Sequence, residues 1–587
     1  MNAKLKTILT TAWNEPRAFF FWLFVFCALL FGSAVLFIHS VTPLPAVQMT
    51  TLFALLGFGG AFGCFVLAWI PPLRRLFAWL LQRRFFVLAC LVTAVALVYA
   101  VENWRGRHAW ADFQREWNAK GEHFDPANLV PPVPDAENFF MAAVWAPFRV
   151  AASNATTRLP EENKLPQLLN AYGPQGGQAP RMGDANRGLR TDLRAWQDFY
   201  RTNNWFETDD GRRTNYFPVA ASPQTPAQDV LLALNKYEAT VEQLHEAAQR
   251  PSARFWIGRE NEFSFSTALL PLLAQMKGCA QYLNLHAIAS LANNDGETAL
   301  KDIQLSIRLA ESLNTEPTLI AYLVQIAISN IRGQAIWEGL ADHRWSDAQL
   351  AALAEAAHQE NHLKNYQIGM RGERRYGLQA LEQIRRSRSW DWLGDAPPET
   401  AKSFWEETLG NSPFRLVPSG WFDQNKVSLS RINVEYFLPL VDVENHLAAP
   451  ATAPRLRQNL PPRLLRTNPY NLFGAMLFPG LERASEKAGR AQAFNDQIRV
   501  ACALERHRLA HGNFPETLAA LEPQFITKLP HDVINGQPLK YRREPDGSFI
   551  LYSVGRNETD DGGTVVSRKS GSVDQTKGDW VWRYPAK

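Results

Sequence analysis

Residues 85–101 have the sequence FFVLACLVTAVALVYAV, a run of 17 residues without a charge. Two longer uncharged runs come before it, at residues 19–38 and 49–70. An α-helix needs about 20 mainly apolar residues to cross the hydrocarbon layer of a membrane. The sequence therefore predicts three transmembrane helices, at about 19–38, 49–70 and 85–104. Together they make a membrane domain that covers residues 1–104.

The orientation of this domain follows from its basic residues, because loops rich in Lys and Arg stay in the cytoplasm. These residues precede the first run or separate the second from the third: Lys4, Lys6, Arg17, Arg74, Arg75, Arg83 and Arg84. The loop at 40–48 has no Lys or Arg. We therefore expect a bacterial inner-membrane protein with a cytoplasmic N-terminus. Residues after about 104 are then extracytoplasmic.

The formal net charge of the whole chain is +4, with a pI of about 8.7. Residues 1–101, however, contain seven basic residues and only one acidic residue, so the remainder of the chain is slightly acidic. The basic excess belongs to the membrane domain. It gives no support for nucleic-acid binding, and we expect no nucleic-acid partner.

Apolar periodicity predicts a mainly α fold for the exported part. Residues 105–222 are expected to be a mostly irregular segment without a core of its own, here called the covering segment. An amphipathic helix at 102–120, which could continue the third span, leads into it. Residues 223–386 form an α-hairpin array, with Thr225 and Ser346 as helix caps. Its helices are expected at about 225–250, 267–291, 297–314 and 346–386, and one more helix is expected to begin near residue 317. Residues 387–477 are an irregular segment and linker, with one helix at about 427–440 and the linker at 449–462.

One stretch of the array, Leu319–Ile328, is almost entirely apolar. Ten residues of helix are too short to cross a bilayer. We therefore expect a buried core helix at this position.

Residues 478–587 predict a small α+β domain. A helix from about 478 ends at His511, and Gly512 supplies the residue after it. A short helix at 515–521 and strands at 539–543 and 548–554 follow. The turn sequence Glu544-Pro545-Asp546-Gly547 joins these strands into a hairpin. A last strand is expected at 580–584.

Within this domain, ALERHRL at 503–509, GNFP at 512–515 and LYSVG at 551–555 resemble the major pseudopilins of type II secretion. The likeness covers about 110 residues and implies their globular fold, with a short helix and a small antiparallel sheet after a long helix. The whole chain resembles uncharacterised bacterial multi-span membrane proteins of similar layout.

The resemblance also implies a calcium site, because the matching loop of pseudopilins binds calcium. Here that loop contains Asn557, Asp560 and Asp561, and Asp579 or Asp574 could complete the oxygen ligands that Ca²⁺ requires. The alternative is a solvated acidic turn. We expect no other cofactor.

No complete catalytic motif occurs: there is no His-Glu-x-x-His, Gly-x-Ser-x-Gly, Cys-x-x-Cys or Gly-x-x-x-x-Gly-Lys sequence. His358 and His362 are four residues apart on a predicted helix, where we expect two surface histidines rather than a zinc site. Cys279 and Cys502 could form a disulfide in an oxidising compartment. Their apolar helical surroundings favour buried free thiols instead.

These observations predict a membrane-anchored extracytoplasmic binding or scaffold protein with a protein partner in the cell envelope, and not an enzyme. One alternative is an envelope hydrolase whose catalytic carboxylates come from distant parts of the chain, because such pairs need no fixed spacing. The other is an accessory component of a type II secretion-like system, suggested by the C-terminal resemblance.

Overall fold

The computed structural model is mainly helical, with a few small sheets. It describes residues 83–124, 133–149, 167–174, 178–207, 210–255, 265–387, 417–448, 452–465, 468–481, 483–569 and 573–583. The predicted spans at 19–38 and 49–70 lie outside these residues. Contacts within the chain define two compact units, Met1–Glu102 and Asn103–Lys587.

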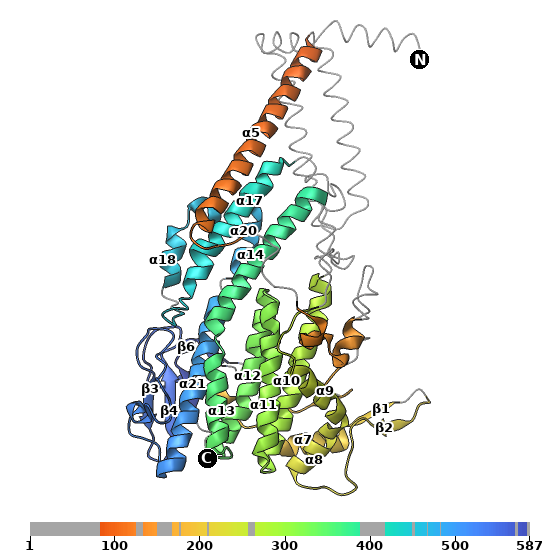
Figure 1. The fold of residues 1–587 in the computed structure, drawn as a ribbon, viewed down its shortest axis with the longest axis vertical. Helices are drawn as coiled ribbons and strands as arrows, with labels where there is room; N and C mark the ends of the chain where they lie inside the picture. The colour runs from red at the N-terminus through yellow and green to blue at the C-terminus, as the bar shows by residue number, and fades with distance from the viewer. Residues whose placement is uncertain are drawn as a thin grey trace. The chain divides into compact units, whose positions relative to one another are not determined.

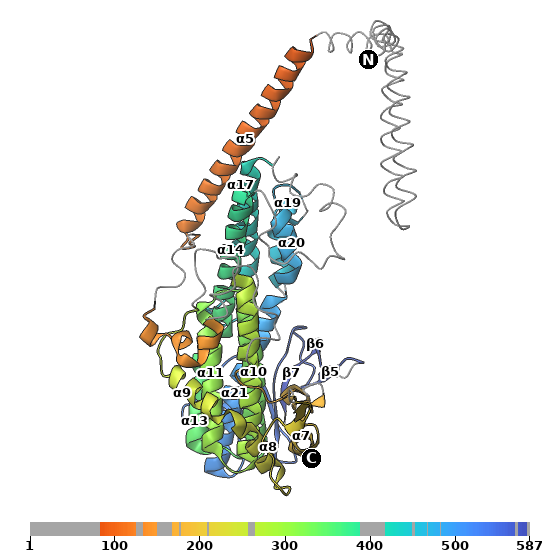
Figure 2. The same ribbon diagram turned by 90° about the vertical axis from the view of Figure 1, so that its right-hand side faces the viewer.

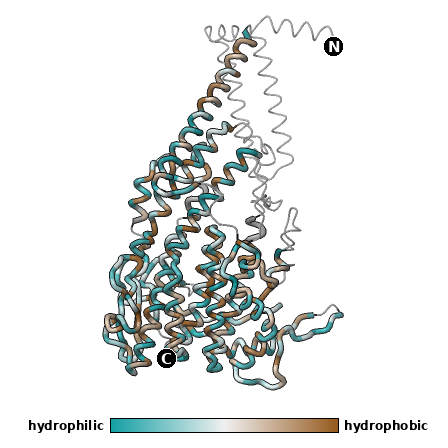
Figure 3. The backbone as a smooth tube through the Cα atoms, viewed as in Figure 1, coloured by the Kyte–Doolittle hydropathy of each residue, from teal (hydrophilic) through white to brown (hydrophobic). Residues whose placement is uncertain are grey.

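The predicted third span and the amphipathic helix after it form one continuous helix, α5 (Arg84–Asn118). Its first half is long and apolar enough to cross a membrane, and Figure 3 shows brown, hydrophobic residues along it. None of the most apolar stretch of 18 residues is buried. Its large apolar side chains, such as those of Phe85, Leu91 and Val98, are more than half exposed. The second half places Phe113 in a core of the second unit.

Among the described residues, one other helix is long and apolar enough to cross a membrane, α12 (Leu319–Ala341). Two-thirds of its most apolar stretch of 18 residues is buried within the protein. This burial confirms the predicted core helix. The predicted length was wrong, because the helix continues for 23 residues. Polar residues end the apolar run after Ile328, but Ser329 and Arg332 are themselves buried against Glu360 of the neighbouring segment.

The helical array surrounds α12. Helix α10 (Phe265–Ala292) packs against both α11 (Gly296–Ser312) and α12, as Figure 1 shows. The helix predicted at 225–250 is divided into α8 (Pro226–Leu234) and α9 (Glu238–Ala248) by a 3₁₀ turn. The predicted capping box is present, with Gln228 N donating to the Thr225 hydroxyl.

The described residues of the segment before the array include the 3₁₀ turns Asp135–Glu137, Phe139–Met141, Ala143–Trp145 and Ala185–Arg187. They also include helix α7 (Leu193–Thr202) and the antiparallel strands β1 (Trp205–Glu207) and β2 (Arg213–Asn215). Helix α7 packs against α8 (Figure 2). Fully buried Phe139, Trp145 and Trp196 from this segment share one core with α8, α10 and α11. The covering segment therefore completes the core of the array.

Two helices replace the single helix predicted at 346–386, namely α13 (Asp347–Gln359) and α14 (His362–Ser387). Helix α17 (Ser419–Ile432) packs against α14 and continues through a π turn, Asn433–Phe437, and a 3₁₀ turn, Leu438–Leu440. Helices α18 (Thr452–Asn459), α19 (Pro462–Leu465) and α20 (Leu472–Leu481) follow. Helix α18, which packs on the π turn, occupies most of the predicted linker.

The last part of the chain begins with α21 (Ala484–His511), which ends at Gly512 in the left-handed conformation. The predicted short helix is only a 3₁₀ turn, Leu518–Leu521. Strands β3 (Lys540–Arg543), β4 (Phe549–Ser553) and β7 (Trp580–Arg583) form an antiparallel sheet in the order β3-β4-β7, close to the three predicted strands. A second hairpin, β5 (Val565–Ser567) and β6 (Val573–Gly578), was not predicted.

The core of this last part is shared with the array. Helix α21 packs against α12, α13 and α14. Cys502 of α21, Trp337 of α12 and Leu551 of β4 belong to one buried cluster. The C-terminal residues therefore do not enclose a core of their own.

Two glycines allow α5 and α17 to cross at close range. A Cβ atom at Gly106 would lie 2.2 Å from the carbonyl oxygen of Gly420. Next to this crossing, Gly420 N donates to the Asn103 side chain over 2.8 Å. The second half of α5, which belongs to the second unit, is thereby held against α17 by backbone contact.

We predict that Gly106→Ala lowers the free energy of unfolding of the full chain by about 1–3 kcal/mol, the usual cost of overpacking. Denaturant or thermal unfolding in detergent measures this change. Gly278→Ala in α10 is the matched control, because its Cβ would meet the nearest atom at an ordinary 3.6 Å. A Gly106→Ala protein as stable as the Gly278→Ala protein would contradict the close crossing.

A second close approach confines the segment that leads into α12. The carbonyl oxygen of Pro317 lies only 1.3 Å from the place where a Cβ of Gly372 on α14 would stand. Glu316 precedes this contact, and its burial raises the pKa of its carboxyl to about 8. The folded protein therefore holds a proton on Glu316 that the unfolded chain loses at much lower pH.

Because the folded state binds this extra proton, raising the pH from about 4.5 to 8 should reduce stability. We predict that Glu316→Gln and the parent protein are similarly stable near pH 5. At pH 8 the variant should be more stable by at least about 1.4 kcal/mol, the equivalent of one pKa unit. Unfolding curves across this range provide the measurement, with exposed Glu242→Gln as control. A difference that does not depend on pH would refute the assignment.

Candidate functional site: a histidine-lined pocket

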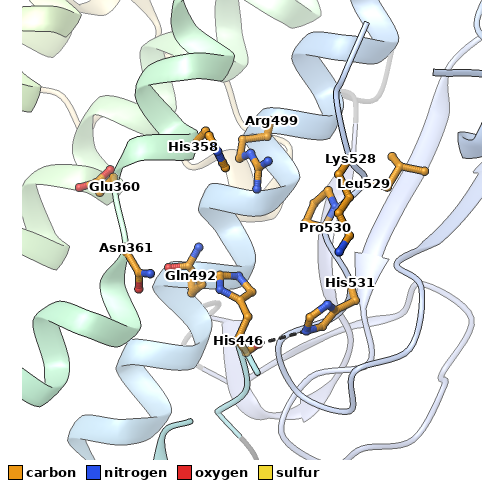
Figure 4. A pocket seen from close by; sticks show the side chains of 10 residues that line it. All are labelled: His358, Glu360, Asn361, His446, Gln492, Arg499, Lys528, Leu529, Pro530 and His531. Atoms are coloured by element: carbon orange, nitrogen blue, oxygen red, sulfur yellow. Dashed lines mark hydrogen bonds between the residues drawn. The ribbon is translucent and has the colours of Figure 1, made fainter. Parts of the chain in front are cut away.

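A pocket of about 250 Å³ lies where four segments that are distant in the sequence converge. The segments are the α13–α14 junction, the turn before α18, helix α21 and the loop before β3. Figure 4 shows their side chains around a common opening. The lining residues are His358, Glu360, Asn361, His446, Gln492, Arg499, Lys528, Leu529, Pro530 and His531.

The α13–α14 junction forms one wall. The chain is extended at Glu360, and the Asn361 side chain accepts a hydrogen bond from Lys364 N over 2.9 Å, which caps the new helix. His358 is exposed at the end of α13, whereas His362 is only 1% exposed. The expectation of two surface histidines on one helix was therefore wrong for His362, because the helix is interrupted between them.

Glu360 is the one carboxylate among the lining residues, and its charge is compensated from behind. Its side chain is ion-paired with Arg332 of α12 and accepts a hydrogen bond from the Ser329 hydroxyl over 2.6 Å. Burial favours the protonated form, but the Arg332 charge and the Ser329 hydrogen bond hold the pKa of Glu360 below its ordinary value. The carboxylate is therefore ionised and matched by a buried arginine.

Asp496 of α21 organises the opposite wall, although it is itself only 1% exposed. Its carboxylate accepts from His446 Nε2 over 2.9 Å, from Arg499 Nη1 over 3.3 Å and from Gln492 Nε2 over 3.3 Å. Since a carboxylate only accepts, the His446 proton must be on Nε2. Three lining side chains are thus oriented by one buried anion.

A tight turn presents His446. Asp442 and Leu447 exchange two backbone hydrogen bonds of 2.8 Å, and His446 has a left-handed φ of +54°. This conformation is uncommon for residues other than glycine and is often retained at functional sites. Ala448 N donates to Val533 O over 2.8 Å, so the turn is tied to the loop that contains His531.

His531 completes the pair of imidazoles. Its Nε2 lies 3.1 Å from the carbonyl oxygen of Asn445 and 3.3 Å from that of His446. Because carbonyl oxygens only accept, Nε2 of this ring also carries its proton. The two rings are perpendicular, with centroids 5.7 Å apart. In both rings Nδ1 is the nitrogen that remains for another partner.

Of the residues that line this pocket, only His358 was a candidate from sequence reasoning. His446, Asp496, Arg499, Lys528 and His531 were not candidates, because no motif or fixed spacing connects them. Neither this pocket nor a second one of about 250 Å³ is lined by a pair of carboxylates. The second pocket lies beside Asp184, Gln281 and Asn330, and Asp184 is its only acidic lining residue.

Of the predicted calcium ligands, Asn557, Asp560 and Asp561 lie in the loop before β5, whereas Asp579 lies between β6 and β7. Asp579 accepts from Gly563 N over 2.7 Å and from two further backbone N–H groups. Asp560 accepts from the Tyr552 hydroxyl over 2.8 Å, and Asp561 accepts from the Asn557 side chain over 2.7 Å. No group of three or more metal-binding side chains gathers in the described part of the chain. Calcium binding stays a prediction that this geometry does not support.

Cys279 and Cys502 are free thiols, as the sequence indicated. Both are fully buried, in different core clusters. Burial raises the pKa of each thiol to about 12, so neither is a nucleophile near neutral pH.

We predict that Asp496→Asn lowers the free energy of unfolding by about 3–5 kcal/mol, because it leaves the partly buried Arg499 and His446 without their anion. Chemical denaturation of the full chain measures the loss. Asp112→Asn on α5 is the control: its exposed pair with Arg115 should contribute less than about 1 kcal/mol. Equal effects in the two variants would show that Asp496 does not organise the pocket.

The chain was compared with family models, with curated proteins and with solved structures, and none of them matches. The fold and the pocket are therefore the basis for any assignment of function. The resemblance of residues 478–587 to pseudopilins stays a prediction.

Proposed function

We propose that this protein is a membrane-anchored binding protein of the bacterial cell envelope. In this proposal residues 1–104 form the membrane domain in the inner membrane, with the N-terminus in the cytoplasm. The compact unit that begins at Asn103 is extracytoplasmic. The histidine-lined pocket receives part of a ligand or of a protein partner.

The observation that carries the proposal is the composition of α5. A single helix combines an apolar stretch that no described residue covers with a following stretch that is packed in a protein core. In water such an uncovered stretch would be strongly unfavourable, since each exposed apolar Å² costs about 25 cal/mol. A bilayer around the first stretch removes this cost. Helix α5 is therefore well suited to tether the compact unit.

Binding is preferred to hydrolysis because of what lines the two pockets. Hydrolysis by dispersed carboxylates requires two closely spaced acids, and each of these two pockets has one acidic residue among the described residues that line it. The histidine-lined pocket instead presents Arg499, Lys528 and three imidazoles, which are groups that hold a ligand through charge and hydrogen bonds.

A second candidate function is an accessory role in a type II secretion-like system. It is favoured by the order of elements from α21 to β7, a long helix followed by a small antiparallel sheet. Cross-linking to pseudopilins in the cell tests this candidate. Its failure leaves the binding proposal intact, because the anchor and the pocket do not depend on it.

The location is tested with a reporter enzyme that is active only outside the cytoplasm. We predict activity when the reporter is fused after Lys587. We predict no activity when it is fused after Arg75, in the basic loop between the second and third predicted spans. Reporter activity in intact cells, normalised to the amount of each fusion protein, is the measurement.

Two results would contradict the proposal. An inactive fusion at Lys587 together with an active fusion at Arg75 would reverse the orientation. Sustained turnover of peptidoglycan, glycan or peptide substrates by the purified full chain would replace binding with catalysis.

A further inference from the structure

We propose that the histidine-lined pocket binds a phosphate-type oxyanion, a tetrahedral group with two negative charges. The inference deepens the proposed binding function, on which it rests, by naming the chemical class of the ligand. It depends on charge, on the direction of the hydrogen-bond donors and on the fixed orientation of the imidazoles.

The pocket has a positive charge in excess. Both carboxylates next to it are already matched by arginines, Glu360 by Arg332 and Asp496 by Arg499. Lys528 is exposed at the pocket and has no ion-pair partner among the described residues. The lining side chains, counted together with Arg332 and Asp496, therefore carry about one positive charge even with every imidazole neutral. An anion is the ligand that compensates it.

The other carboxylates on the lining segments form hydrogen bonds within the protein. Asp442 accepts from Asn445 in the same turn, and Glu522 accepts from Leu529 N. Asp532 is buried and accepts from the Ser553 hydroxyl and from Val554 N. Glu444 belongs to the turn of His446 but is not a lining residue. None of these acids takes the place of an external anion in the pocket.

The donors come from separate sides of the opening, as Figure 4 shows. Arg499 approaches from α21 and Lys528 from the loop before β3. The rings of His446 and His531 lie on the side below, and each can donate into the pocket only when Nδ1 is also protonated. Arg499 has five N–H groups and contacts Asp496 through Nη1. Donors on several sides suit a tetrahedral anion better than a planar carboxylate, which takes two parallel hydrogen bonds from one side.

The imidazoles add a dependence on pH. Nε2 of His446 and of His531 already donates within the protein, so the next proton on each ring must go to Nδ1. Such a proton provides one more donor and one more positive charge on the ring. Anion binding and proton uptake should therefore favour each other.

A metal ion is a less suitable ligand. The two rings could offer two nitrogen ligands, but no group of three or more metal-binding side chains occurs among the residues that the structure describes. Structural and catalytic zinc sites use at least three protein ligands. The nearby Arg499 and Lys528 would also repel a cation.

The test measures inorganic phosphate binding to the full chain in detergent by titration calorimetry. We expect saturable binding that Lys528→Gln weakens at least fivefold. Lys577→Gln, the same change on exposed β6 and away from the pocket, should have no effect. Both variants alter exposed side chains, and their unfolding curves verify that they are folded. Titration with sulfate, which keeps two charges between pH 6 and pH 8, should show at least threefold tighter binding at pH 6.

Several outcomes would overturn the proposal. They are the absence of saturable binding, equal weakening by Lys528→Gln and Lys577→Gln, or sulfate binding that does not change with pH. Acetate that binds as tightly as phosphate would assign the pocket to carboxylates instead. These results leave the reporter-fusion test untouched, so failure of the anion proposal is distinguishable from failure of the membrane-anchored binding function.

Discussion

The second unit depends on the satisfaction of polar groups along α12. This helix is buried by α10, α11, α14 and α21, yet it carries Arg332, Gln334 and Glu338. An unpaired polar group in a protein interior costs several kcal/mol. Here Gln334 accepts from Ala185 N and donates to Leu189 O, and Glu338 accepts from Thr191 N.

These hydrogen bonds explain how distant parts of the chain are assembled. The Trp337 indole of α12 donates to the carbonyl oxygen of Arg583 at the end of β7, and Arg332 is paired with Glu360 at the pocket. The covering segment, the C-terminal sheet and the α13–α14 junction are therefore all attached to one helix.

Much of the helical architecture could be predicted, because apolar periodicity and caps such as Thr225 and Ser346 are local signals. Three features escaped prediction for physical reasons. The continuation of α12 depends on tertiary partners for its polar half. The break at Glu360 lies within a polar sequence that is compatible with a helix. Strand β5 has only three residues and β6 is mostly polar, so neither shows the alternation that identifies a strand. The pocket was missed because its charged residues converge only through the packing of α21 against α14 and the turn at His446.

The two buried thiols have a consequence for how the molecule matures. Cys279 and Cys502 belong to different cores and are inaccessible once folding is complete. Thiol–disulfide exchange requires an exposed thiolate, so these two thiols are inert to oxidants in the folded protein. In an oxidising compartment the speed of folding, rather than any covalent bond, thus protects Cys279 and Cys502 from a wrong disulfide.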